Sequence, residues 1–86
     1  MADYEVLVSR RAADEIEDLP KSIATRVYAK LEALAHEPRL SGVKKLRGSA
    51  KGWRIRVGDY RVLFEVDDER RVVDVAAVRH RSKAYD

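Results

Sequence analysis

The chain has 86 residues and a mass of 9.8 kDa, which suits one domain and excludes two of ordinary size, because independent domains usually contain roughly 100 to 150 residues. Hydrophobic residues make up 45% and charged residues 38%, enough apolar material for a core, while the absence of cysteine excludes disulfides, a thiolate nucleophile and thiolate metal sites. No apolar run approaches the roughly 20 residues of a membrane helix, so we expect a soluble, cytoplasmic protein with no membrane partner.

The first half of the chain predicts one strand followed by two helices. Residues 4–8 combine aromatic and β-branched side chains as a strand does, and Ser9 is placed to cap a helix. Apolar residues then recur at helical spacing up to Pro20, at Ala12, Ile16 and Leu19. A second helix is expected from Lys21 to about His36, with an apolar stripe at Ile23, Val27, Leu31 and Leu34.

The second half predicts strands. Residues 39–52 contain several glycines and read as a loop or a short edge strand. Residues 53–57 and 60–66 alternate apolar and polar side chains around a Gly58-Asp59 turn, which indicates a hairpin. The nearly continuous apolar run 72–78 predicts a central strand that is buried on both faces. The predicted fold class is therefore α+β: a β-α-α-β-β-β domain over residues 1–86, with an antiparallel-rich sheet and a helix hairpin on one face.

Positive charge is concentrated in the second half. Residues 1–43 carry six Lys/Arg and eight Asp/Glu, whereas residues 44–86 carry twelve and seven. Within residues 44–61 seven basic side chains accompany the single acid Asp59. This segregation suits a polyanionic partner such as nucleic acid, although a solvated basic face without a ligand explains charge density equally well.

Strand alternation predicts where the arginines point. If Trp53, Ile55 and Val57 face the helices, Arg54 and Arg56 must face the other way, and the same parity places Arg61 beside them. Guanidinium groups bind phosphate oxygens well. The alternative is that these arginines only keep the sheet soluble, or pair with Glu65 for roughly 0 to 1 kcal/mol.

Three segments carry a resemblance to a known family: Leu46-Arg47-Gly48 with Trp53-Arg54-Ile55-Arg56-Val57, then Gly58-Asp59-Tyr60-Arg61-Val62-Leu63-Phe64, then Val78-Arg79-His80-Arg81 leading to Tyr85. With the opening strand and helix pair, they resemble the RelE/ParE superfamily of bacterial and archaeal toxins, and more specifically its RelE-type ribosome-dependent mRNA interferases. The first two segments occur across the superfamily. The His80-Arg81 and Tyr85 ending is similar to the RNA-cleaving branch.

The resemblance implies a toxin of a type II toxin-antitoxin system that cuts mRNA in the ribosomal A site through attack by the RNA's own 2′-hydroxyl. It implies a RelB-like antitoxin, the ribosome and mRNA as partners, and no metal or cofactor. Arg61 and Arg81 match the phosphate-clamping arginines of the family, and Tyr85 its base-stacking tyrosine. Arg54 and Arg56 stand where the best-known members have lysines, and an arginine is a poor base because it stays protonated.

Proton transfer is therefore assigned to His80, or else the reaction depends on orientation and electrostatics, with Arg81 or His80 assisting the leaving oxygen. The candidate catalytic residues are Arg54, Arg56, Arg61, His80, Arg81 and Tyr85, and the candidate RNA-binding residues are Lys44, Lys45, Arg47, Lys51, Arg79 and Lys83. Two alternatives stay open: a ParE-like toxin that inhibits DNA gyrase, and a nucleic-acid-binding module without chemistry.

Overall fold

The computed structural model describes residues 3–48 and 51–83, and its elements follow the predicted order. They are β1 (Glu5–Val8), α1 (Arg10–Glu17), α2 (Lys21–His36), β2 (Lys44–Lys45), β3 (Gly52–Val57), β4 (Tyr60–Asp67), β5 (Val72–His80) and the 3-10 turn η1 (Arg81–Lys83). The α+β prediction is confirmed. No helix within the described ranges is long and apolar enough to cross a membrane.

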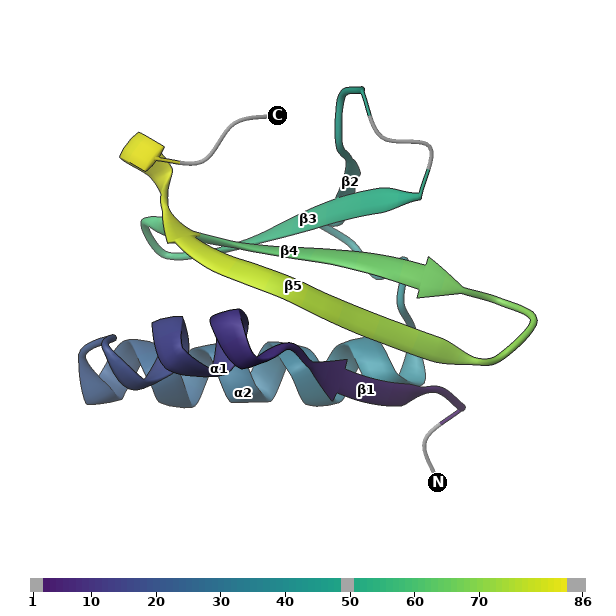
Figure 1. Cartoon of the computed structure of the whole chain (residues 1–86), viewed down its shortest axis with the longest axis horizontal. Coiled ribbons are helices and arrows are strands. Elements are labelled where there is room, and N and C mark those ends of the chain that lie inside the picture. Colours follow the sequence, from purple (N-terminus) through teal and green to yellow (C-terminus); the bar gives the residue numbers. More distant parts are fainter. Residues whose placement is uncertain (1–2, 49–50, 84–86) are drawn as a thin grey trace.

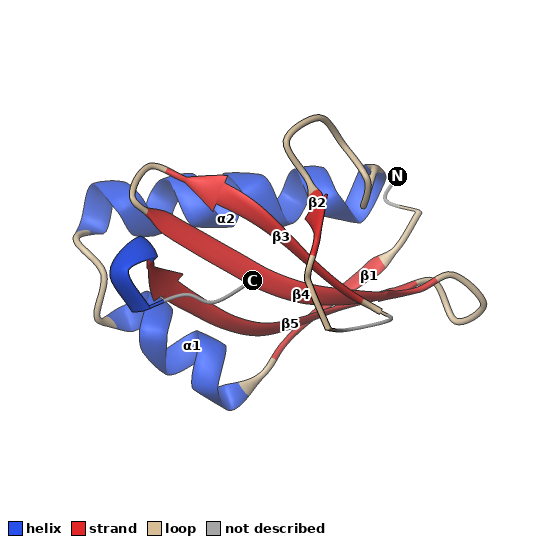
Figure 2. Ribbon diagram, turned by 90° about the horizontal axis from the view of Figure 1, so that it is seen from above, coloured by secondary structure: helices blue, strands red, loops and turns tan. Residues whose placement is uncertain are grey.

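The strands form one five-stranded sheet in the order β1-β5-β4-β3-β2. β1 runs parallel to β5, and the other neighbours are antiparallel. Within the part of the chain that the structure describes, α1 and α2 both lie against the same face of the sheet, and neither covers the opposite face (Figure 1, Figure 2). The uncovered face is therefore the one on which the polar residues of β3 and β4 stand.

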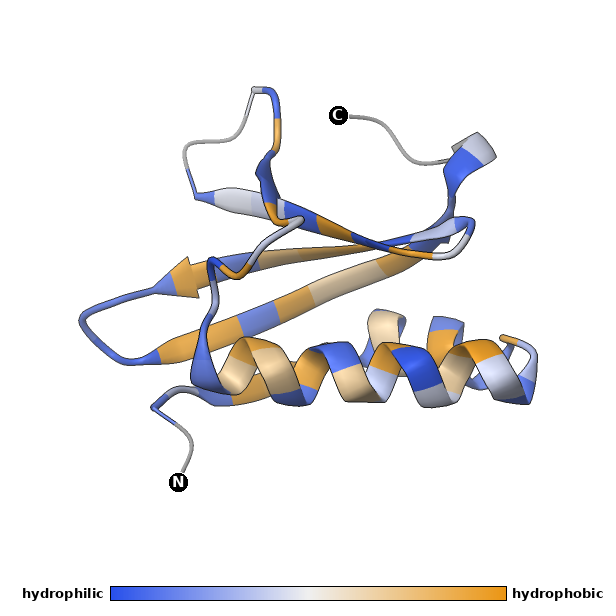
Figure 3. Cartoon of the chain, turned by 180° about the vertical axis from the view of Figure 1, so that it is seen from behind, coloured by the Kyte–Doolittle hydropathy of each residue, from blue (hydrophilic) through white to orange (hydrophobic). Residues whose placement is uncertain are grey.

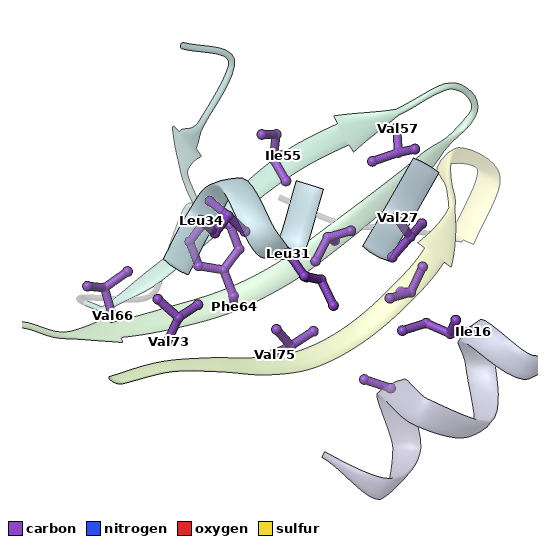
Figure 4. Packing of buried hydrophobic residues seen from close by; sticks show 13 residues of the cluster. Ile16, Val27, Leu31, Leu34, Ile55, Val57, Phe64, Val66, Val73 and Val75 are labelled. Atoms are coloured by element: carbon purple, nitrogen blue, oxygen red, sulfur yellow. The ribbon is translucent and has the colours of Figure 1, made fainter. Parts of the chain in front are cut away.

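The core lies between the helices and the sheet, where the hydrophobic residues of both layers meet (Figure 3). Phe64 is 1% exposed and stands opposite Trp53 on β3 and Val75 on β5. Val27, Leu31 and Leu34 of α2 and Ile16 of α1 cover this row from the helix side (Figure 4). Burying each such side chain stabilises the fold by about 1.5 to 3 kcal/mol. Because the apolar residues of β3 and β4 recur with period two, the face of the sheet that carries them is the one that packs against the helices.

A β-bulge in β5 changes the alternation of that strand. Leu63 pairs with Ala77 but Phe64 pairs with Val75, so Ala76 has no opposite residue on β4. Val73 and Val75 face the helices before the bulge, and Val78 faces them after it, so the parity shifts by one residue. The bulge thereby decides on which side of the sheet every residue from Ala77 to His80 stands.

Ser9 forms hydrogen bonds with the bulged part of β5. Its hydroxyl accepts the backbone N–H of Ala12 at 3.0 Å, capping α1 as predicted, and donates to the carbonyl of Ala76, also at 3.0 Å. Its own N–H donates to the carbonyl of Val75 at 2.9 Å. One residue between β1 and α1 thus starts the helix and bonds the irregular part of β5.

Three side chains form a hydrogen-bonded cluster at the end of the sheet where β4 turns into β5. Arg39 donates two hydrogen bonds to Asp68, at 3.0 and 2.8 Å, and the hydroxyl of Tyr4 donates a third at 2.6 Å. The hydrogen bonds from Arg39, and secondarily from Tyr4, lower the pKa of Asp68 to about 2. Arg39 also lies over the Trp53 ring, 5.3 Å from its centroid. The cluster joins the start of β1, the segment after α2 and the β4–β5 turn.

Replacing Asp68 with asparagine is expected to weaken the acid dependence of stability. A carboxylate whose pKa is lowered on folding stabilises the native state above its unfolded pKa, and this contribution disappears as the pH falls towards about 2. The wild-type melting temperature should therefore fall more than that of Asp68→Asn between about pH 4 and pH 2. Glu69→Gln, on the same turn, is the matched control and should follow the wild type. Parallel curves for wild type and Asp68→Asn would contradict this account.

Candidate nucleic-acid interface

Three arginines share the helix-free face of the sheet. Ile55 pairs with Val62 in the core, and the flanking pairs Arg54–Leu63 and Arg56–Arg61 must point the other way. We call Arg54, Arg56 and Arg61 the arginine face. The strand register thus brings together the three residues that the sequence predicted to lie side by side.

The arginine face holds its charges close together and partly shielded. Arg56 and Arg61 stand directly opposite each other on paired strands, an arrangement of like charges that costs stability. The Nε atoms of Arg54 and Arg61 are buried, although both residues are partly exposed. Partial shielding strengthens the attraction of such groups for an anion, because less water competes for them. The face is suited to bind phosphate oxygens.

Arg79 is the neighbour of Arg61 in the strand register, but its side chain extends towards α1. It pairs with Arg61 across β4 and β5, a placement that depends on the bulge. Its Nε lies 3.8 Å from an oxygen of Glu15 on α1. The same oxygen lies 3.7 Å from Nε of Arg11. Arg79 therefore borders the arginine face, while its charge is directed to a carboxylate at the edge of the sheet.

Glu15 completes the edge of β5 where β1 has ended. The last residue of β1 in the register is Val8, opposite Val75. Beyond it, the N–H of Val78 donates to Oε1 of Glu15 at 2.8 Å. A side-chain carboxylate thus replaces a strand carbonyl for the part of β5 that leads to η1.

Replacing Glu15 with alanine is expected to destabilise the protein by about 1 to 3 kcal/mol, because the part-buried N–H of Val78 loses its acceptor. Glu15→Gln keeps an oxygen acceptor and should lose less. Urea unfolding measures both, with Glu17→Gln on the exposed side of α1 as control. Equal losses for the alanine and glutamine variants would mean that the charge, and not the hydrogen bond to β5, is what stabilises the fold.

Arg81 lies at the start of η1, beside the β3–β4 turn. Its N–H donates to the carbonyl of Asp59 at 2.7 Å, and its Nε lies 4.0 Å from a carboxylate oxygen of the same residue. The Arg81 side chain is 62% exposed. η1 rises on the side of the sheet away from the helices, as does the segment that follows β2 (Figure 1). Arg81 is thus held by its backbone at one end of the helix-free side, with an accessible guanidinium.

His80 does not join the arginine face. It pairs with Tyr60, whose register neighbour Val57 is a core residue, so the imidazole stands on the helix side of the sheet. There it lines a cleft of about 450 Å³ between β5 and α1, together with Arg11, Glu15, Asp18, Leu19, Tyr60, Val78, Arg79 and Ser82. The sequence grouped His80 with the arginines, and the parity change at Ala76 separates them.

The other predicted residues differ in where the structure places them. Lys44 pairs with Arg54 and so shares its face, whereas Lys45 pairs with Trp53 and has the opposite parity. Arg47 and Lys51 are exposed in the segment between β2 and β3, and Lys83 belongs to η1. Tyr85 lies outside the described residues.

Among the described residues no three His, Asp or Glu side chains gather to hold a metal ion. The expectation of no metal or cofactor stays a prediction.

Comparison with known proteins agrees with the fold. Residues 6–85 match the family described as ParE toxin of type II toxin-antitoxin system, parDE. Toxin RelE of Mycobacterium tuberculosis is 33% identical over 84 residues, which are 95% of this chain and 86% of the relative.

Two solved structures are similar over nearly their whole length. The RelE of the archaeal RelE-RelB complex from Pyrococcus horikoshii superposes with a TM-score of 0.84 at 28% identity, covering 95% of this chain and 99% of that one. The toxin-antitoxin complex RelBE2 from Mycobacterium tuberculosis gives a TM-score of 0.81 at 33% identity, covering 96% and 97%.

Proposed function

The chain belongs to the ParE toxin family of type II toxin-antitoxin systems, and from this membership we propose that it is a ribosome-dependent endoribonuclease that cleaves mRNA in the A site. The observation that carries the proposal is the arginine face with Arg81 at its end. It combines several cationic side chains with a side of the sheet that neither α1 nor α2 covers. A single-stranded polyanion fits such a surface.

In the proposed reaction the RNA supplies its own nucleophile. The 2′-oxygen forms a bond to phosphorus, the bond from phosphorus to the 5′-oxygen breaks, and a 2′,3′-cyclic phosphate and a 5′-hydroxyl result. The 2′ proton passes to water, and the leaving oxygen takes a proton from water. Arg61 and Arg81 hold the non-bridging oxygens and stabilise the charge that grows on them in the transition state.

Arg54 and Arg56 act in this scheme as phosphate ligands. Their guanidiniums stay protonated at all physiological pH values, so they contribute positive charge and orientation. Further basic residues are proposed to extend the contact along the RNA. Lys44 shares the arginine face, and its neighbour on β2 is Lys45. The others are Arg47, Lys51, Arg79 and Lys83. Tyr85 stacks on a base. Residues 1–86 act as one domain in the cytoplasm, where mRNA is translated.

A cognate RelB-like antitoxin is the proposed partner that restrains this activity. The similar chains from Pyrococcus horikoshii and Mycobacterium tuberculosis were both solved in toxin-antitoxin complexes. We propose that the antitoxin lays apolar side chains of a helix on this domain and places acidic residues near the arginine face. Binding there would remove the phosphate site from competition by RNA.

Inhibition of DNA gyrase is the second candidate, because the matching family is described by its ParE members. Endonuclease activity is favoured since the similar curated chain is named RelE. A basic domain that binds nucleic acid without chemistry is the third.

Controlled expression during active translation, with mapping of mRNA 5′ ends, separates the three. If the protein is an endonuclease, new mRNA 5′ ends should appear within translated frames, in register with codons. If it inhibits gyrase, DNA damage and loss of supercoiling should appear without such ends. If it only binds nucleic acid, neither change should appear.

A further inference from the structure

His80 is in hydrogen-bond contact with Ser82, the residue two positions after it. The backbone N–H of Ser82 donates to Nδ1 of His80 over 3.2 Å, and the hydroxyl oxygen of Ser82 lies 2.9 Å from the same nitrogen. A backbone N–H can donate only to an unprotonated nitrogen, so the ring proton of neutral His80 must be on Nε2. Nδ1 is therefore occupied as a hydrogen-bond acceptor for the first turn of η1.

The ring that provides this acceptor is itself held in place. The Tyr60 ring meets the His80 ring edge-on, with centroids 5.3 Å apart and planes at 89°. Both rings line the cleft against α1, on the side of the sheet away from the arginine face. An edge-on aromatic pair at this distance is favourable and restricts the orientation of both rings.

Arg81 lies between His80 and Ser82 in the chain. Its own N–H is bound to the carbonyl of Asp59 at 2.7 Å, and the next N–H along the chain is the one bound to His80. The backbone on both sides of Arg81 is thus fixed, while its side chain is 62% exposed. These two hydrogen bonds hold the backbone from which the Arg81 side chain extends.

We propose that His80 is a positioning residue that aims Arg81 at the scissile phosphate by accepting the N–H of Ser82, and that it carries no proton in the reaction. The inference rests on the proposed endonuclease function. It assigns the imidazole to the role that a capping side chain has at the start of a helix. A shift of Arg81 by about 1 Å would be enough to slow an oriented reaction by up to roughly 100-fold.

Asparagine distinguishes the two roles of His80. Its Oδ1 is the same number of bonds from Cα as Nδ1 of histidine, so His80→Asn can accept the Ser82 N–H but cannot relay a proton near neutral pH. His80→Leu can do neither. Cleavage of ribosome-bound mRNA should stay within about threefold of wild type in His80→Asn and fall by roughly 10- to 100-fold in His80→Leu. His36→Asn, at the end of α2, controls for loss of a histidine.

Nuclear magnetic resonance tests the geometry without any assay of cleavage. Long-range ¹H–¹⁵N correlation spectra of the wild-type protein, recorded at a pH at which the His80 imidazole is uncharged, should show the ring proton on Nε2. The amide of Ser82 should exchange at least about tenfold faster in His80→Leu than in wild type or His80→Asn. Protonation on Nδ1, or equal exchange in all three proteins, would overturn the capping role.

The outcomes separate this inference from the function it rests on. If His80→Asn folds, keeps the slow Ser82 exchange and yet cleaves as poorly as His80→Leu, the imidazole transfers a proton and the positioning role is wrong. If the wild type itself cuts no mRNA while the exchange pattern is as expected, the proposed endonuclease function fails. In that case the hydrogen bond from Ser82 still orients Arg81 for whatever anion it binds.

Discussion

Replacing Arg81 with alanine is expected to slow cleavage of ribosome-bound mRNA by roughly 100-fold or more. In the proposed reaction its guanidinium stabilises negative charge that increases as the phosphate becomes five-coordinate, so the loss falls on the transition state. In the same proposal ribosome binding is spread over many basic side chains, and it should weaken much less. Single-turnover rates at saturating toxin, compared with the binding constant from the same titration, measure the two effects separately.

Arg70→Ala is the matched control for this experiment. Arg70 is an exposed arginine on the β4–β5 turn, which lies at the other end of β5 from η1. Its removal lowers the net charge by the same amount and should leave the rate nearly unchanged. If Arg81→Ala and Arg70→Ala weakened binding equally and left the single-turnover rate intact, Arg81 would be one contact among many, and the proposed transition-state role would have to be abandoned.

The position of the arginine face could be predicted from the sequence because only one simple rule was needed. Side chains alternate along a strand, and Trp53, Ile55 and Val57 are too apolar to face water as a row. The pair Arg56–Arg61 then followed from the two-residue turn at Gly58, which takes the left-handed φ of 59° that such a turn needs. Local pattern and turn chemistry agreed, so both faces of the hairpin were predicted correctly.

The side on which His80 stands could not be predicted in the same way. The run from Val72 to Val78 is apolar at almost every position, so it contains no alternation from which a bulge could be detected. The carbonyl of Ala76 at the bulge accepts a hydrogen bond from Ser9, which is 67 residues away in sequence. Long-range contacts of this kind leave no periodic signal, and the grouping of His80 with the arginines was the consequence.

The edge of β5 illustrates the same limit. In the sequence, Glu15 is only one of the polar residues between the apolar positions Ala12, Ile16 and Leu19 of the predicted first helix. In the structure it occupies the place of a missing strand neighbour and binds both Val78 and Arg79. The requirement arises because β1 ends four residues into its pairing with β5. A buried or part-buried backbone donor needs a partner, and only the three-dimensional arrangement reveals which donor lacks one from the sheet.

Purified protein is expected to cut naked RNA at least about 1,000-fold more slowly than the same sequence in a ribosome with an open A site. The arginine face offers guanidiniums, which stabilise charge but do not remove the 2′ proton. The rate must then depend on how well the 2′-oxygen, the phosphorus and the leaving oxygen are brought into line. A flexible single strand adopts that geometry rarely, whereas the decoding site holds mRNA in one conformation.

Single-turnover cleavage of one end-labelled mRNA, free and bound to ribosomes stalled before a chosen codon, measures the ratio. Arg61→Ala serves as the comparison, because it removes a proposed phosphate contact of the arginine face. It should slow the ribosomal reaction while leaving the ribosome's own ordering of the mRNA intact. Equal rates on free and bound RNA would mean that the protein orients its substrate alone. In that case a proton-transfer group must lie within reach of the arginine face, and the chemistry would no longer depend on orientation by the ribosome.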